Sequence, residues 1–195
     1  VTSISVGVSF TCAVAVGDTY CWGLNDNGQI GDGSTYNQSK PTRVADLDAA
    51  TSVSAGAQTA CAVAGGSAYC WGNNAFGQLG DGTKDSRSTA TLVSGIDEVT
   101  AISTGTGQTT CAIAGGEIGY CWGANAWGSV GDGTLTDRPN PVRLNGLSDV
   151  TAISAGERTT CALASSYVYC WGFNATGQLG VGNTDDRLTP TQVTY

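Results

Sequence analysis

The sequence predicts an all-β fold built from four repeated units, each of about four antiparallel strands arranged like a blade of a β-propeller. The motif Tyr-Cys-Trp-Gly occurs four times, with its tryptophan at Trp22, Trp71, Trp122 and Trp171. A period of 49 to 51 residues between these tryptophans is typical of propeller blades and other arrays of small sheets. No segment has helical periodicity, whereas short alternating segments are frequent.

The composition is consistent with a turn-rich β-protein. The 195 residues suffice for one domain with its own core, and they include 29 glycines and no methionine. Eight basic and sixteen acidic residues give a net charge of −8, so a nucleic-acid partner is not expected. No apolar run approaches membrane-spanning length, so no membrane insertion is expected. No signal peptide is visible at Val1, so the sequence resembles a mature chain or an excised segment.

We expect a single repeat domain over residues 1–195, divided into repeats 1–49, 50–98, 99–149 and 150–195. Each repeat opens with an alternating strand, at Val1–Gly7, Thr51–Gly56, Val99–Gly105 and Val150–Gly156. A cysteine hairpin and a glycine-rich loop follow. The repeats then close with extended segments around Pro41–Val44, Ala90–Val93, Pro141–Leu144 and Pro190–Val193.

The cysteine hairpin sets the register of each repeat. In the second repeat, two alternating segments flank Gly65-Gly66, which is a signal for a two-residue β-hairpin turn. This turn places Cys61 opposite Cys70. The third repeat has one more residue, and a three-residue turn over 115–117 restores the same pairing.

Cysteines that face each other across a hairpin are close enough to form a disulfide. The predicted bonds are Cys12 with Cys21, Cys61 with Cys70, Cys111 with Cys121, and Cys161 with Cys170. Zinc ligation is disfavoured, because zinc-binding cysteine pairs are usually two to four residues apart and the chain has no histidine. Free buried thiols are the other alternative. Four disulfides imply an oxidising location: extracellular, cell-surface or periplasmic.

Both faces of each hairpin are apolar and must be covered. In the second repeat, one face carries Ala62, Ala64, Tyr69 and Trp71, and the other carries Cys61, Val63 and Cys70. We therefore expect the sheets to stack face to face, with the aromatic residues in the core rather than on a ligand.

The stretch from Trp71 to Gly82, preceded by Ser54-Ala55-Gly56 and Cys61-Ala62-Val63, resembles the repeat of the regulator of chromosome condensation family. The other copies, Trp22–Gly33, Trp122–Gly133 and Trp171–Gly182, are similar to it. The resemblance implies a β-propeller of four-stranded blades, usually seven. In the family a histidine often follows the strand-ending glycine by three residues. Here Phe10, Thr59 and Thr159 stand at that place, and Thr109, four residues after Gly105, stands at the matching place of the third repeat.

The resemblance also implies candidate functions. A eukaryotic member is an exchange factor for the small GTPase Ran and binds chromatin, but the predicted disulfides and the acidic charge argue against either activity here. A secreted propeller similar to this family inhibits β-lactamases.

No catalytic constellation is recognisable, because there is no histidine base, no free nucleophile motif and no phosphate-binding loop. Asp32, Asp81 and Asp132 lie in Gly-Asp-Gly turns, where a carboxylate usually caps its own backbone, and Val181 replaces the aspartate in the fourth copy. A calcium loop that also uses Asp85, Asp137, Asp185 and Asp186 is the disfavoured alternative. The arginines Arg87, Arg138 and Arg187, with Gln38 at the matching place, are expected to fix the long loop by ion pairs. No cofactor or metal is expected.

Two sequons, at Asn37 and Asn174, are possible glycosylation sites. Asn174 aligns with Asn25, Asn74 and Asn125, which favours a role in stabilising a turn. Asn37 is therefore the more credible glycan site.

These features favour a non-catalytic extracellular or cell-surface binding module that binds a protein partner or associates with itself through its first and last repeats. The alternative is a secreted inhibitor of an enzyme. A GTPase exchange factor or an enzyme is the least favoured interpretation.

Overall fold

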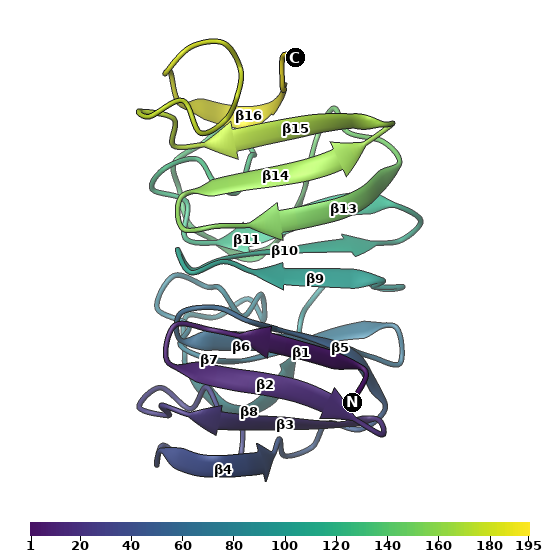
Figure 1. Ribbon diagram of the computed structural model, residues 1–195, viewed down its shortest axis with the longest axis vertical. Helices are drawn as coiled ribbons and strands as arrows, with labels where there is room; N and C mark the ends of the chain where they lie inside the picture. Colours follow the sequence, from purple (N-terminus) through teal and green to yellow (C-terminus); the bar gives the residue numbers. More distant parts are fainter.

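The computed structural model describes residues 1–195 as sixteen strands in four antiparallel sheets, one sheet per repeat (Figure 1). The first sheet contains β1 (Ser3–Val6), β2 (Phe10–Ala15), β3 (Asp18–Gly23) and β4 (Gln38–Arg43). The second contains β5 (Ala50–Ala55), β6 (Thr59–Ala64), β7 (Ser67–Gly72) and β8 (Arg87–Leu92). The third contains β9 (Ala101–Thr104), β10 (Thr109–Ala114), β11 (Ile118–Gly123) and β12 (Arg138–Arg143). The fourth contains β13 (Val150–Ala155), β14 (Thr159–Ala164), β15 (Tyr167–Gly172) and β16 (Arg187–Gln192).

The all-β class and the hairpin register are confirmed. Cys61 pairs with Cys70 across β6 and β7, and the other three hairpins pair their cysteines in the same way. All four predicted disulfides are present, with Cα atoms 4.0 to 4.1 Å apart, and no cysteine is free. The turn residues have positive φ, as the primed two-residue turns require: 57° at Gly65 and 79° at Gly66.

The closing strand of each repeat begins about three residues earlier than the sequence predicted. In the second repeat it spans Arg87–Leu92, because Arg87 pairs with Gly72 while Cys70 pairs with Thr91. The register shift between Cys70 and Gly72 is a β-bulge, which lets the arginine continue the ladder. The prolines of these strands are tolerated because the strands lie on the outer edge of each sheet.

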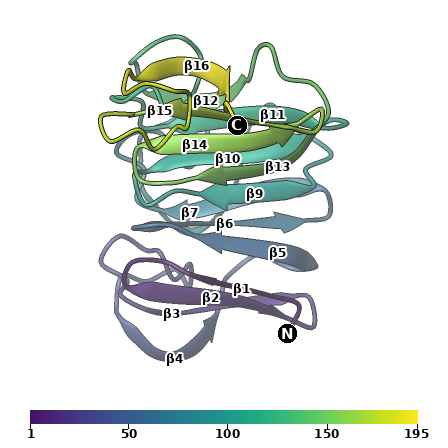
Figure 2. The same cartoon turned by 45° about the horizontal axis from the view of Figure 1, so that its top comes forward.

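The sheets stack face to face, as predicted (Figure 2). Ala62, Ala64 and Trp71 of the second sheet pack in one cluster with Cys12 and Cys21 of the first. The opposite face of the second sheet, with its cystine, packs in the same way on Trp122 and Ala112 of the third. The aromatic face of each sheet therefore covers the cystine face of the sheet before it.

The stacked sheets form a continuous arc. Contacts join the innermost strands β1, β5, β9 and β13 in succession. The N-terminus lies on the first sheet and the C-terminus beside β16, at opposite ends of the stack (Figure 1). The structure contains no helix long and apolar enough to cross a membrane.

Candidate binding surface

A buried asparagine holds the glycine-rich loop that follows each hairpin. Asn74 is fully buried. Its Nδ2 donates to the carbonyl oxygens of Thr83 at 3.2 Å and Asp85 at 3.0 Å, and its Oδ1 accepts from the amide of Leu79 at 2.9 Å. Asn25, Asn125 and Asn174 make the same contacts in their own loops. These four side chains fix the shape of the loops on one edge of the arc.

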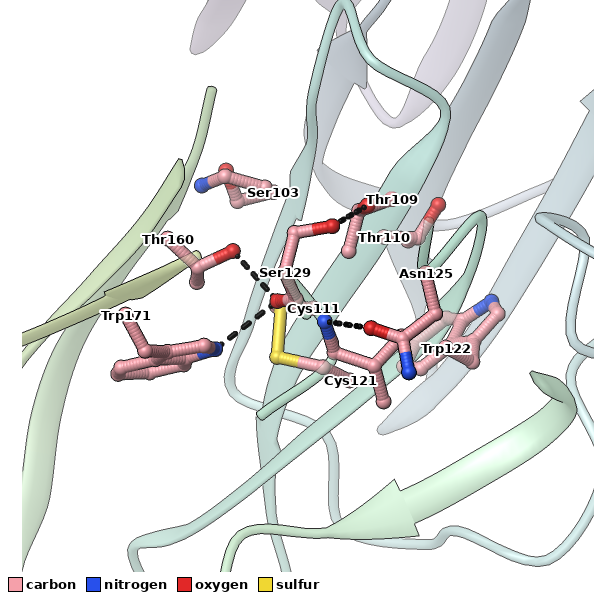
Figure 3. The surroundings of a disulfide bond; sticks show 12 residues. Ser103, Thr109, Thr110, Cys111, Cys121, Trp122, Asn125, Ser129, Thr160 and Trp171 are labelled. Carbon is pink, nitrogen blue, oxygen red and sulfur yellow. Dashed lines mark hydrogen bonds between the residues drawn. A yellow bond between two sulfur atoms is a disulfide. The ribbon is translucent and has the colours of Figure 1, made fainter. Parts of the chain in front are cut away.

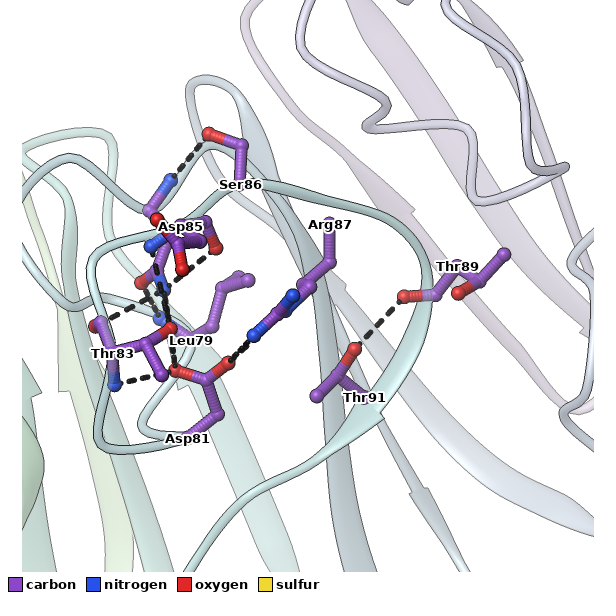
Figure 4. Close-up of polar contacts among 9 residues, drawn as sticks. Leu79, Asp81, Thr83, Asp85, Ser86, Arg87, Thr89 and Thr91 are labelled. Carbon is purple, nitrogen blue, oxygen red and sulfur yellow. Dashed lines mark hydrogen bonds and ion pairs between the residues drawn. The ribbon is translucent and has the colours of Figure 1, made fainter.

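Nδ2 of Asn74 also donates to Oδ1 of Asp81, the aspartate of the Gly-Asp-Gly turn, at 3.2 Å. Figure 4 shows Asp81 with Thr83 and Arg87. Oδ1 of Asp81 accepts from the backbone amide of Thr83 at 2.9 Å and from its hydroxyl at 2.7 Å, while Oδ2 pairs with Arg87 at 3.2 Å. Burial by itself would raise the pKa of Asp81, but the hydrogen bonds from Thr83 and Arg87 outweigh it, and the pKa lies below its ordinary value. Asp132 has the same arrangement with Thr134 and Arg138.

The aspartates thus cap their turns as predicted, and Arg87 and Arg138 fix the loops by ion pairs. In the first repeat Gln38 donates to Asp32 at 2.8 Å instead. The fourth repeat has Val181 in place of the aspartate. There Arg187 donates to Oδ1 of Asn183 at 3.1 Å and forms a long ion pair with Asp185 at 4.0 Å. The chain contains no group of three or more His, Cys, Asp or Glu side chains placed to hold a metal ion.

The two sequons lie in different environments. Asn174 is fully buried and both ends of its amide are engaged, so the folded chain does not present it to a modifying enzyme. Asn37 is exposed. Its Oδ1 accepts from the amide of Asn25 at 2.8 Å, which leaves Nδ2 without a partner within the chain. Glycosylation of Asn37 stays a prediction.

Each junction between sheets also fixes a loop against the next tryptophan (Figure 3). The carbonyl oxygen of Ser129 accepts from Nε1 of Trp171 at 2.9 Å and from the hydroxyl of Thr160 at 2.8 Å. The hydroxyl of Ser129 pairs with that of Thr109 at 2.8 Å. Trp71, Trp122 and Trp171 are fully buried and belong to the core, as the sequence predicted, whereas Trp22 on the first sheet is only partly buried.

Trp127 and Phe76 are large, apolar and exposed residues on this edge that share one pocket. Trp127 is 41% exposed and Phe76 39%. Both line a surface pocket of about 240 Å³ that also includes Gln108 and Arg158. An exposed aromatic pair beside a pocket is typical of a binding site.

The guanidinium of Arg158 stacks on two aromatic rings. Its Cζ lies 5.0 Å from the ring centroid of Trp127 and 5.7 Å from that of Phe173, and the two rings contact each other edge to face at 4.9 Å. The only carboxylate in contact with it is that of Glu157, at 3.3 Å. Stacking fixes the position of the guanidinium while most of its N–H groups stay available.

Sequence reasoning missed the roles of Arg158 and Phe173. The sequence did contain a signal, because Arg158 and Phe173 differ in chemical type from the residues at the same positions of the other three repeats. Arg158 replaces Ser9, Gln58 and Gln108, and Phe173 replaces Leu24, Asn73 and Ala124. Only the structure brings these two loops to Trp127, which belongs to the preceding repeat.

Repeated four-stranded sheets stacked around common inner strands, with loops gathered on one edge, define a propeller-type repeat protein. The sequence profile of the family described as "Regulator of chromosome condensation (RCC1) repeat" matches residues 17–63, 65–112, 120–163 and 166–195. The chain therefore belongs to the RCC1 repeat family.

Solved structures give the same result. Human WBSCR16 superposes with a TM-score of 0.87 at 25% identity, over 98% of this chain and 52% of that one. Yeast RCC1 (Prp20), solved bound to Kap60, has a TM-score of 0.85 at 20% identity, over 98% and 48% of the two chains. The CRINKLY WD40 ectodomain of the Arabidopsis thaliana receptor kinase ACR4 has a TM-score of 0.52 at 18% identity, over 98% and 65%. The chain thus spans about half the length of the first two.

The RCC1-type propeller fold fits a binding or scaffold module, and the four disulfides indicate an oxidising, extracellular-type environment.

Proposed function

We propose that this chain is a non-catalytic binding module of the extracellular space or cell surface, and that a protein partner contacts the pocket around Trp127. The observation that carries the proposal is the exposed cluster of Trp127, Phe76 and Arg158, in which Phe76 and Trp127 stand on loops held by the buried Asn74 and Asn125. Tryptophan and arginine are the residues most enriched among those that dominate binding energy in protein interfaces. A rigid loop scaffold adds affinity because little conformational entropy is lost on binding.

The proposal includes self-association through the first and last repeats, because their outer faces are apolar and uncovered. On the first sheet Ile4 is 66% exposed and Val6 72%, and on the last sheet Leu163 is 38% exposed.

The test uses immobilised wild-type chain and the variant Trp127→Ala/Arg158→Ala, each incubated with the secreted and surface protein fraction of the source cells. A partner retained by the wild type and lost from the double variant supports the proposal. The control is Leu92→Ala, because Leu92 is also a large exposed apolar residue but lies on the outer strand β8. Equal retention by all three proteins, or no retained protein, contradicts the proposal.

The second candidate is an inhibitor that binds an enzyme through the same loops. It is favoured by the position of the aromatic cluster on the loop edge, next to the exposed carboxylate of Glu157. Hydrolysis by a panel of β-lactamases is measured with and without the chain. Inhibition that disappears in Trp127→Ala/Arg158→Ala supports this candidate, and unchanged hydrolysis excludes these enzymes as targets.

A further inference from the structure

The three junctions between successive sheets repeat one pattern of hydrogen bonds. At each, the indole Nε1 of the later repeat donates to a loop carbonyl of the earlier one. The pairs are Trp71 with Gln29 at 2.9 Å, Trp122 with Gln78 at 3.0 Å, and Trp171 with Ser129 at 2.9 Å. The indole bond is therefore a general feature of how one blade contacts the next.

A serine on the innermost strand supplies the second bond of each junction. Its hydroxyl accepts from a backbone amide of the next sheet: Ser5 from Ala55 at 2.9 Å, Ser54 from Thr104 at 2.9 Å, and Ser103 from Ala155 at 3.0 Å.

A third bond joins the outer parts of the sheets. Here a loop glycine amide donates to a carbonyl of the next closing strand. The pairs are Gly33 with Ser88 at 2.9 Å, Gly82 with Pro139 at 3.0 Å, and Gly133 with Leu188 at 2.9 Å.

The two ends of the arc carry the unpaired halves of this same pattern. On the first sheet, the indole of Trp22, the amide of Val6 and the carbonyl of Ser39 have no junction partner. On the last sheet, the carbonyl of Gln178, the hydroxyl of Ser154 and the amide of Gly182 have none, and all three residues are exposed. Each donor on one end thus matches an acceptor on the other.

The shapes of the ends match as well. A Cβ added to Gly31, Gly80 or Gly131 would lie 2.6 to 2.8 Å from the indole nitrogen of the next repeat. The equivalent Gly180 meets no tryptophan, so its loop has open space where an indole would lie. Leu163 on the last sheet is 38% exposed, whereas its counterparts Val63 and Ile113 are covered and only 3% exposed.

We infer that the partner that covers the last sheet is the first sheet of a second copy of this chain, seated through Trp22 on Gln178, Val6 on Ser154, and Gly182 on Ser39. The inference rests on the self-association part of the proposed function but not on the Trp127 pocket. The contact is heterologous, because it joins two different surfaces. Such a contact closes a pair if the rotation from sheet to sheet suits, and otherwise it generates a head-to-tail filament.

The first experiment measures the mass of the native, oxidised chain in solution at several concentrations. A species larger than the 19.7 kDa chain that grows with concentration is expected, as a closed pair or as a head-to-tail filament. A chain that stays at the mass of one copy at every concentration overturns the inference.

Two single-end variants then identify the surfaces. Leu163→Arg places a charge on the last sheet, and Ile4→Arg places one on the first sheet. Each variant alone is expected to weaken self-association more than tenfold. An equimolar mixture is expected to form a one-to-one complex, because the intact last sheet of Ile4→Arg meets the intact first sheet of Leu163→Arg. Self-association of either variant at wild-type strength, or no complex in the mixture, contradicts the inference.

The matched control is Leu92→Arg, since arginine already stands at this position in the first and third repeats, as Arg43 and Arg143. It is expected to associate like the wild type. If Leu163→Arg fails to fold, as judged by circular dichroism and thiol titration, Ser154→Glu on the same sheet takes its place. Trp127→Ala is expected to leave association intact, so a failure of the pocket proposal and a failure of this inference are distinguishable.

Discussion

At the scale of single residues, Val16 occupies a left-handed turn position that suits asparagine or glycine better than valine. It is the first turn residue of the first hairpin, with φ of 54°, and it is 97% exposed. A β-branched residue in this left-handed region costs about 1 to 2 kcal/mol relative to a residue that tolerates it. Since Gly17 follows it, Val16→Asn creates the preferred Asn-Gly turn.

We expect Val16→Asn to raise the free energy of unfolding by about 1 kcal/mol, measured by denaturant titration. The converse change tests the reason, because Gly65 has φ of 57° at the same place in the second hairpin. Gly65→Val should lower stability by a similar amount. Unchanged stability in both Val16→Asn and Gly65→Val would refute the strain argument.

At the scale of elements, the hydrogen bond of the indole is expected to add to the free energy of unfolding at each junction between sheets. Trp22, on the uncovered first sheet, should add nothing in this way. Trp71→Phe removes the donor to the carbonyl of Gln29 in a fully buried site and should cost about 2 kcal/mol. Trp22→Phe is the matched control in the single chain, because Trp22 has no such acceptor. Calorimetric unfolding at low concentration should show a clearly smaller loss for Trp22→Phe.

The disulfides differ in whether a neighbouring sheet covers them. Replacing Cys61 and Cys70 together by alanine is expected to destabilise the chain by about 2 to 3 kcal/mol through loss of the cross-link, with an added cost because both sites are fully buried. Cys161 and Cys170 have the same sequence separation of 9 but lie on the uncovered last sheet. Replacing Cys161 and Cys170 by alanine should lower the free energy of unfolding, measured with denaturant, by less than replacing Cys61 and Cys70. An equal or larger loss would show that packing around the disulfide plays no part.

At the scale of the whole molecule, three aspartates make stability depend on pH. Burial would raise the pKa values of Asp32, Asp81 and Asp132, but their hydrogen bonds lower all three below the ordinary 3.8. A lowered pKa in the folded state means that the unfolded chain binds protons first. The stabilisation is thus complete above about pH 4 to 5 and is lost as the pH falls through the lowered values.

We therefore expect the free energy of unfolding to fall as the pH is reduced below about 4. Asp81→Asn should flatten this dependence. The control is Asp85→Asn in the same loop, where the carboxylate makes no hydrogen bond or ion pair, and the readout is denaturant unfolding at several pH values. A dependence as steep in Asp81→Asn as in the wild type would contradict the assignment.

The sequence by itself determined the repeat, the strand content and the cysteine pairing. These follow from local rules: a two-residue turn fixes the register of Cys61 and Cys70, and alternation assigns Trp71 and Val63 to opposite faces. The start of each closing strand could not be predicted, because the bulge before Gly72 depends on pairing between segments separated by a long loop.

Only the tertiary structure decided which side chains from different repeats meet. Trp127 and Arg158 belong to different loops, and their stacking arises from the rotation of one blade on the next, which no local pattern encodes. The complementary ends depend on the same rotation, because Trp22 and Gln178 are recognised as partners only by comparison with the three formed junctions. Local chemistry therefore specified the blade, while the packing of blade on blade created both proposed binding surfaces.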